Sequence, residues 1–249
     1  MATTQQSNSL SRKIDFAIII KVQNANPNGD PLNGNRPRTN YAGIGEMTDV
    51  CIKRKIRDRL MERYVRRKED GLTVAGQAIF VQSDDRKIDG ETSLKNRAES
   101  ALGKAAFAKA AKEETALRAC KEWFDVRAFG QVFAFKKSDA NKSKAKKDND
   151  PEDSGANMDA DGVSIPVRGP VSVHSAFSVE RVDVSSQQIT KSVNLEGDGS
   201  SRASDTMGMK HRVDHGIYTC VGSMNPQLAV RTTFSDADAT MTRPMSSRQ

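Results

Sequence analysis

The chain has 249 residues, enough to bury a hydrophobic core as one large domain or as one domain with insertions. Only 36% of the residues are hydrophobic and 29% are charged, which indicates that part of the chain does not pack into a core. The formal net charge of +7 favours a polyanionic partner such as nucleic acid. We expect no membrane association, because no apolar run approaches the roughly 20 residues of a spanning helix and residues 1–13 lack an apolar signal core.

The three cysteines, Cys51, Cys120 and Cys220, are widely spaced, and none belongs to a CxxC pair. An odd number of cysteines without a signal peptide indicates reduced thiols rather than a disulfide framework or a zinc site. We therefore expect a soluble cytoplasmic protein that holds neither a metal nor a cofactor.

The first predicted element is a buried strand over residues 13–23, which are β-branched and aromatic. A long polar loop, "NPNGDPLNGNRPRTNY" (26–41), follows it. Thr48 as N-cap and Asp49 in the first turn predict a helix that runs to about Lys68. The stretch "GQAIFVQS" (76–83) predicts a short second strand.

Residues 91–122 are rich in Ala, Lys and Glu, which predicts two helices broken near Gly103 or Glu113. Residues 123–135 predict another strand. Residues 136–162 contain no aromatic and no β-branched residue, so they cannot bury enough apolar surface to offset the entropy lost on ordering, and we expect a disordered loop.

Residues 162–184 predict two strands broken at Gly169-Pro170, and residues 216–225 predict one more. Between them, residues 185–215 predict a long excursion with turn residues at its tip. This order of elements predicts an α+β fold, with helices on one face of a largely antiparallel sheet and a ferredoxin-like core with long insertions.

The helix predicted after Thr48 is strongly basic, and two of its cations lie in an unexpected sector. Placing residues at about 100° per position gives it an apolar face of Ile52, Ile56, Leu60 and Tyr64, with Val50 and Met61 at the edge. Lys53 and Arg57 fall inside that sector, where an unpaired cation costs several kcal/mol. Either their stems follow the edge of the core, or their heads converge on an anion near the start of the helix.

The preceding loop brings Arg36 and Arg38 just upstream of this helix, and its Asn and Gly residues expose backbone donors. Such a surface suits a phosphate chain, and an ordinary surface loop remains the alternative.

Five collinear motifs carry a family resemblance: "NANPNGDPLNGNRPR" with "MTDVCIKRKIRD", "WFDVRAFGQVF", "VRGPVSVHSAFSVERV", "TMGMKHRVDHGIY" and "FSDAD". From about residue 14 to 238 the chain resembles the Cas-seven-type backbone subunit (RAMP superfamily) of type I-C CRISPR surveillance complexes, known as Cascade. The family pattern continues past "FSDAD" into a helical segment, whereas residues 239–249 show no amphipathic pattern. We therefore expect an irregular tail and a truncated or altered end.

The resemblance implies a modified RNA-recognition-motif palm, a helical fingers insertion and a β-hairpin thumb. The palm would comprise residues 13–84, 123–184 and 216–238. The fingers would comprise residues 85–122, and the thumb residues 185–215. Several copies would stack head to tail along one CRISPR RNA, together with other Cascade subunits, and present the guide to target DNA in antiviral defence. The implied RNA-binding residues are Arg36, Arg38, Lys53, Arg54 and Arg57 in the palm, and Met207, Met209, Lys210 and His211 in the thumb. No enzymatic activity is expected.

The composition agrees with this reading in one respect. A protein that holds any guide must grip phosphates and sugars rather than base edges. Only 5% of the residues are aromatic, and no strand has the aromatic pattern with which RNA-recognition motifs stack bases. Affinity for RNA should therefore fall steeply with salt.

Three alternatives remain. A metal-dependent ribonuclease subunit, as in type III complexes, would use Asp30, although "NGDP" is equally an ordinary turn. A zinc-binding module would use His211 and His215, which lack the glutamate of the HExxH motif, while His174 is interpreted as structural. A generic basic RNA-binding protein would share the charge but form no filament.

Overall fold

The computed structural model describes residues 9–107, 111–135, 163–190 and 207–241. The loop predicted to be disordered, 136–162, lies outside the described residues, as do the tip of the predicted excursion and residues 242–249 of the predicted tail.

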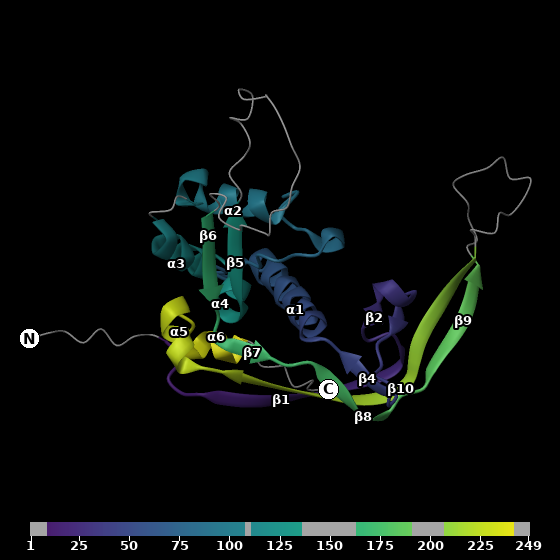
Figure 1. Ribbon diagram of the computed structural model, residues 1–249. Helices are drawn as coiled ribbons and strands as arrows, with labels where there is room; N and C mark the ends of the chain where they lie inside the picture. The colour runs from purple at the N-terminus through teal and green to yellow at the C-terminus, as the bar shows by residue number, and fades with distance from the viewer. Residues whose placement is uncertain (1–8, 108–110, 136–162, 191–206, 242–249) are drawn as a thin grey trace, which may run out of the picture. The chain divides into compact units, whose positions relative to one another are not determined.

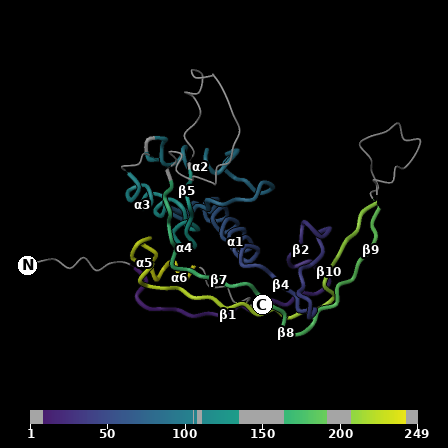
Figure 2. The backbone as a smooth tube through the Cα atoms, in the orientation of Figure 1, coloured from purple at the N-terminus to yellow at the C-terminus, as the bar shows by residue number. Residues whose placement is uncertain are grey.

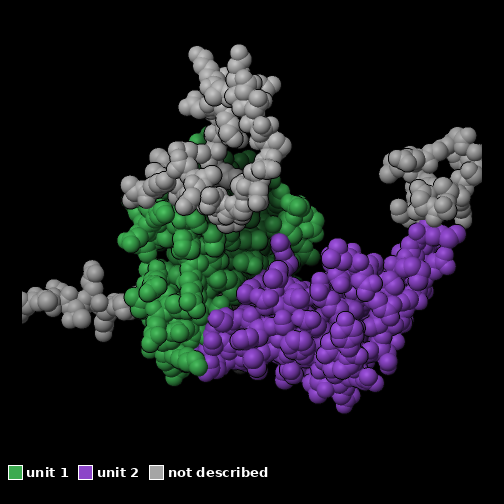
Figure 3. All heavy atoms as spheres, in the orientation of Figure 1, with its two compact units in different colours: residues 1–13, 57–171, 224–249 green, residues 14–56, 172–223 purple. Residues whose placement is uncertain are grey.

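The chain divides into two compact units, shown in different colours in Figure 3. Unit 1 comprises residues 1–13, 57–171 and 224–249, and unit 2 comprises residues 14–56 and 172–223. The residues predicted for the palm are distributed over both units, so the division into palm, fingers and thumb stays a prediction.

Unit 2 is built on an antiparallel sheet, as the order of the predicted elements indicates. In the described residues its strand order is β1 (Ile14–Ala25), β10 (Met207–Met224), β8 (Ala176–Arg181) and β4 (Ile44–Met47), with β7 (Val171–Val173) and β9 (Val184–Thr190) also paired to β10 (Figure 1). The pairs β10–β8, β10–β9 and β4–β8 are antiparallel. The protein therefore has the predicted α+β class.

Two smaller features of unit 2 matter for function. The loop after β1 forms a two-stranded ribbon of β2 (Gly29–Asp30) and β3 (Arg36–Pro37), closed by a short 3-10 helix η1 (Pro31–Asn33). Strands β9 and β10 form the two arms of a hairpin, which Figures 1 and 2 show side by side up to the end of the described segments.

Unit 1 holds most of the helices. They are α1 (Asp49–Glu69, whose first two turns belong to unit 2), α2 (Leu94–Leu102), α3 (Lys112–Glu122), α4 (Phe124–Phe129), α5 (Pro226–Thr232), α6 (Asp236–Met241) and the 3-10 turns η2 (Asp84–Arg86) and η3 (Lys104–Phe107). Strands β5 (Gly130–Phe135) and β6 (Val163–Arg168) pair antiparallel. None of the helices in the described ranges combines the length and apolar character that crossing a membrane requires.

The core of unit 1 is an aromatic cluster. The ring of Phe80 lies 4.6 Å from that of Trp123 and 5.2 Å from that of Phe133, and all three side chains are buried. Ala98 of α2 and Ala119 of α3 pack into the same cluster, so the Ala-rich helices meet a core of large rings.

The strand β1 and the helix α1 confirm the elements predicted for residues 13–23 and 49–68. The predicted burial of that strand is wrong, because only Val22 of β1 is buried and Ile19 is 74% exposed. Gly103 ends α2 at a positive φ of 83°, as the predicted break requires. On α1 the side chains of Ile52 and Leu60 are buried as expected, but Val50, placed at the edge of the apolar face, is 69% exposed.

The strand predicted over residues 76–83 is wrong, and the strand predicted over residues 123–135 is confirmed only for residues 130–135, which form β5. Residues 76–83 are irregular apart from one bridge between Ala78 and Trp123, and residues 124–129 form α4. The common cause is Asp125, a fully buried carboxylate that accepts hydrogen bonds from the N–H groups of Phe80 (2.7 Å) and Val81 (3.1 Å). These bonds satisfy a buried backbone that would otherwise need a strand partner.

The predicted irregular tail is wrong for residues 239–241, which end α6. Ser235 and Asp238 form a reciprocal cap, with the N–H of Ser235 2.9 Å from Asp238 Oδ2 and the N–H of Asp238 3.2 Å from Ser235 Oγ. Asp238 also pairs with the buried Arg127 at 2.9 Å, so a long-range ion pair stabilises a helix that hydrophobic periodicity does not reveal.

Tyr218 offers a test of packing in unit 2. Its side chain is fully buried, and its hydroxyl has no hydrogen-bond partner within the described residues, because the ring lies directly against Gly45, where there is no room for a Cβ. Burial also raises the pKa of this hydroxyl, so it stays protonated at neutral pH.

We predict that Tyr218→Phe raises the free energy of unfolding by about 1 kcal/mol, because it removes a buried polar group without a partner. Urea unfolding measures this, with Tyr41→Phe as the matched control, since the Tyr41 ring is exposed and should show no change. A loss of stability in Tyr218→Phe would mean that the hydroxyl is hydrogen-bonded in the folded protein.

Candidate nucleic-acid interface

The polar loop 26–41 is anchored to the first turn of α1. Asn28 Oδ1 accepts hydrogen bonds from both the N–H (2.9 Å) and the hydroxyl (3.0 Å) of Thr48. Thr48 Oγ1 in turn accepts from the N–H of Cys51 at 3.3 Å, which confirms Thr48 as the N-cap. One asparagine side chain therefore joins the loop to the cap of the basic helix.

The loop also has a structure of its own. Gly34 and Asn35 both have positive φ (56° and 59°), which closes the ribbon over η1. The N–H of Asn35 donates to the carbonyl of Asp30 at 2.8 Å, and Asn26 Nδ2 donates to the carbonyl of Asn35 at 2.6 Å. The turn residues thus build a defined surface.

Asp30 and Arg38 form an ion pair inside this loop, with Arg38 Nη2 3.2 Å from Asp30 Oδ1. The same carboxylate oxygen accepts the N–H of Leu32 at 3.3 Å, which caps η1. Asp30 therefore has the role of an ordinary turn residue, while the Arg38 side chain remains 38% exposed.

Arg36 connects the loop to the hairpin. Its Nη1 donates to Ser186 Oγ at 3.1 Å, and Ser186 Oγ lies 2.8 Å from Nδ1 of His211. Ser186 and His211 face one another across the β9–β10 ladder. The structure thus brings together Arg36 and His211, two predicted site residues that are 175 positions apart in the sequence.

The hairpin distributes the other predicted residues over its two faces. Since side chains alternate along a strand, Met207, Met209 and His211 share one face and Lys210 lies on the other. Met207 and Met209 are 57% and 55% exposed, and together they form an adaptable apolar surface on one face of the hairpin.

The first turns of α1 carry Lys53 and Arg54. Lys53 Nζ lies 2.9 Å from Asp49 Oδ2, and this hydrogen bond holds the pKa of Asp49 below its usual value. Nη1 of Arg54 is buried and has no acceptor within the described residues. A buried donor without an acceptor is costly, and a phosphate oxygen would satisfy it.

Arg57 has a different environment, in unit 1. Its Nε donates to Asp125 Oδ2 at 2.8 Å, its guanidinium lies 5.2 Å from the centre of the Phe129 ring, and its side chain is 13% exposed. This pair explains how a cation lies in the apolar sector of α1. Lys53 and Arg57 bind separate carboxylates, so the structure gives Arg57 a structural partner and does not show the two heads converging.

The alternatives based on metals find no support in the geometry. No group of three or more His, Cys, Asp or Glu side chains that could hold a metal ion occurs among the described residues. His211 and His215 both lie on β10, where residues four apart are about 13 Å from one another. Such a pair is too far apart to share one ion.

All three cysteines are free. Burial raises the pKa of each thiol, that of Cys120 to about 11, so the thiols remain protonated at neutral pH.

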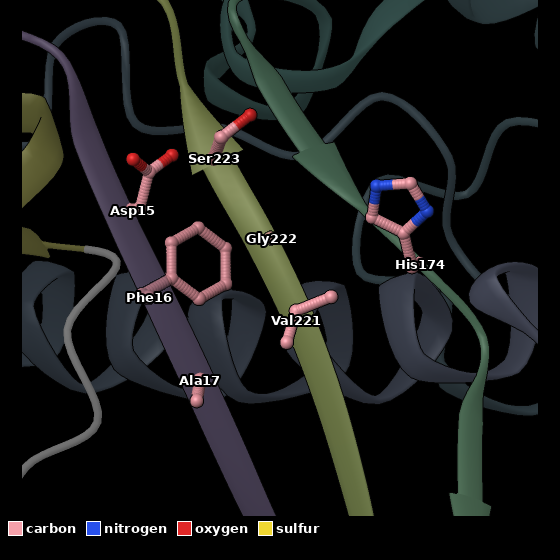
Figure 4. Close-up of a pocket in the computed structure, with 7 residues that line it drawn as sticks. All are labelled: Asp15, Phe16, Ala17, His174, Val221, Gly222 and Ser223. Atoms are coloured by element: carbon pink, nitrogen blue, oxygen red, sulfur yellow. The ribbon is translucent and has the colours of Figure 1, made fainter.

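Unit 2 also has a depression of about 510 Å³ at the edge of the sheet, shown in Figure 4. The Phe16 ring lies against Gly222, leaving no room there for a Cβ. The polar side chains of Asp15, Ser223 and His174 come from three different places along the sheet and do not converge on one point. This arrangement fits neither a catalytic group nor a phosphate site.

Sequence reasoning missed Asn28 and Ser186, although both position predicted residues. Ser186 gives no sequence signal, because its partner Arg36 is 150 positions away. Asn28 lies in a run of turn residues that are alike in composition, and its distinct role appears only in the contact with Thr48.

Fold and site together define an α+β protein with a basic helix, an ordered loop anchored to its cap, and a hairpin joined to that loop. The chain belongs to the CRISPR-associated protein Cas7 family, whose model matches residues 12–243. The chain is 27% identical over 230 residues to the CRISPR-associated protein Cas7 of Haloferax volcanii, a match that covers 90% of this chain and 60% of that relative. It thus spans about 60% of the length of this curated relative.

A solved structure titled "CRISPR RNA-guided surveillance complex, pre-nicking" contains a chain of 16% sequence identity. The alignment covers 93% of this chain and 69% of that one, with a TM-score of 0.44.

We predict that Arg57→Ala lowers the free energy of unfolding by about 3 kcal/mol, because it leaves the buried Asp125 carboxylate without its cation. Chemical denaturation measures the loss. The matched control is Arg59→Ala, on the same helix but 83% exposed, for which a change within about 0.5 kcal/mol is expected. Equal, small losses in both variants would contradict a structural role for Arg57.

Proposed function

We propose that this protein is the multi-copy backbone subunit of a type I-C Cascade surveillance complex. It binds CRISPR RNA without regard to sequence and presents the guide for pairing with target DNA in antiviral defence. Copies of the chain bind head to tail along one RNA, and other Cascade subunits complete the assembly. Family membership supports the general assignment, and the five sequence motifs support the subtype.

One observation carries the proposal: Arg36 of the loop, Ser186 of β9 and His211 of β10 form a continuous chain of contacts. A phosphate chain that runs along the loop would therefore meet the exposed methionines of the hairpin next. The guanidinium of Arg36 has further N–H donors beyond the one that Ser186 accepts. These donors, together with the unpaired Nη1 of Arg54, suit phosphate oxygens.

The proposed grip is electrostatic and independent of base identity. Arginine and lysine contacts to phosphates release counterions, so the logarithm of the binding constant falls linearly with the logarithm of salt concentration. Each phosphate contact on a single strand contributes about 0.7 to that slope. RNAs of equal length and unrelated sequence should show the same slope.

We predict that the double variant Arg36→Ala/Arg54→Ala binds single-stranded RNA more weakly and reduces the salt slope by about 1.4, two phosphate contacts at about 0.7 each. Fluorescence anisotropy at several salt concentrations measures both quantities. The control is Arg59→Ala/Lys95→Ala, which removes the same charge from exposed positions of unit 1. Equal slopes in the two double variants would contradict a specific phosphate surface in unit 2.

Head-to-tail binding makes a second, independent prediction. The mass of the complex should increase in equal steps as the CRISPR RNA is lengthened, because each added copy covers a fixed length of RNA. Size-exclusion chromatography with light scattering measures the steps. A single copy on every RNA, whatever its length, would instead indicate a generic RNA-binding protein.

A further inference from the structure

The turn that leads from the loop into β4 presents a fully exposed aromatic ring. Tyr41 is the most exposed of the large apolar side chains in the described residues. Single exposed apolar side chains are common on protein surfaces and mean little by themselves. The backbone beneath Tyr41 is what distinguishes it.

Several hydrogen bonds fix the backbone of residues 40–44. Asn40 Oδ1 accepts from the N–H groups of Ala42 (2.9 Å) and Ile44 (3.0 Å), and the N–H of Asn40 donates to the carbonyl of Ile44 at 2.9 Å. The N–H of Gly43 donates to the carbonyl of Asn40 at 3.0 Å, and Gly43 adopts a positive φ of 78°. Tyr41 therefore projects from a rigid corner, and fixing its ring costs only two side-chain torsions.

A guanidinium reinforces the same corner. Arg181 Nε donates to the carbonyl of Ala42 at 2.6 Å, and the N–H of Val182 donates to the carbonyl of Gly43 at 3.0 Å. The aliphatic part of Arg181 runs along Gly43, where an added Cβ would lie 3.6 Å from Cγ. The turn thus offers an exposed aromatic ring next to Ala42, whose carbonyl is bound by the charged guanidinium of Arg181.

A rigid aromatic ring beside a cation is how single-stranded nucleic acids are held without sequence preference, because every base has a π-face on which to stack. We propose that Tyr41 stacks on a nucleobase of the bound RNA, while Arg181 offers its remaining donors to the adjoining phosphate. This inference rests on the proposed RNA-binding function and deepens it. It also revises the expectation from composition that the chain grips RNA through phosphates and sugars alone.

The test compares Tyr41→Ala, Tyr41→Leu and Tyr41→Phe in binding to a single-stranded RNA of about 12 nucleotides, within the range that one single-strand-binding fold covers. Both Tyr41→Ala and Tyr41→Leu should weaken binding about tenfold, because neither keeps a π-face, whereas Tyr41→Phe should bind within about twofold of wild type. The matched control is Leu72→Ala, at a 50% exposed apolar position of unit 1, and it should bind like wild type. Circular dichroism checks that each variant is folded.

A spectroscopic reading separates stacking from a general loss of affinity. RNA that carries 2-aminopurine should lose fluorescence on binding wild type and Tyr41→Phe at saturation, and should lose less on binding Tyr41→Leu. The salt slope should stay the same in Tyr41→Leu, since no charge is removed.

The outcomes are distinguishable. If wild type binds RNA and Tyr41→Ala binds it equally well, the stacking inference is wrong and the proposed function stands. If Tyr41→Ala leaves binding to the short RNA unchanged but reduces assembly on longer RNA, Tyr41 contacts a neighbouring protein and the inference is likewise wrong. If wild type binds no RNA at all, both the proposed function and this inference are wrong.

Discussion

The contact between Asn28 and Thr48 is the constraint on which the candidate interface depends. A single amide oxygen accepts both the N–H and the hydroxyl of the residue that caps α1, so the start of the basic helix and the base of the polar loop are held in one position. From that anchor the loop closes through Gly34 and Asn35 and brings Arg36 to Ser186 of the hairpin. Two hydrogen bonds between Asn28 and Thr48, and one between Arg36 and Ser186, thus join the loop, the start of α1 and the hairpin into one surface.

The buried arginines of unit 1 and two arginines of the candidate interface have different partners. In unit 1, Arg57, Arg97 and Arg127 are nearly buried, and each pairs with a carboxylate. Such pairs hold irregular backbone and short helices in place, and removing one partner is costly. In unit 2, Arg36 bonds to a neutral hydroxyl and Arg54 keeps a donor without an acceptor. These three arginines of unit 1 are neutralised within the fold, whereas Arg36 and Arg54 of unit 2 keep N–H donors for a ligand.

Sequence reasoning succeeds where the signal is local. The N-cap at Thr48, the apolar stripe of α1 and the glycine at the end of α2 follow from neighbouring residues, and the structure has them. It fails where a distant partner decides. Phe124, Val126 and Ala128 alternate like a strand, yet Asp125 and Arg127 between them are buried and paired with Arg57 and Asp238, which favours a helix. At the candidate site, the sequence identifies the cations. It does not reveal that Arg57 is already neutralised by Asp125 within the fold.

On the function that we propose, RNA lies against the loop, the start of α1 and the hairpin arms of unit 2. Ultraviolet cross-linking of the bound RNA, followed by mass spectrometry of the peptides, tests it most directly. We expect nucleotide adducts within residues 26–56 and 207–215. Adducts confined to unit 1, with those two segments unmodified at saturating RNA, would contradict it.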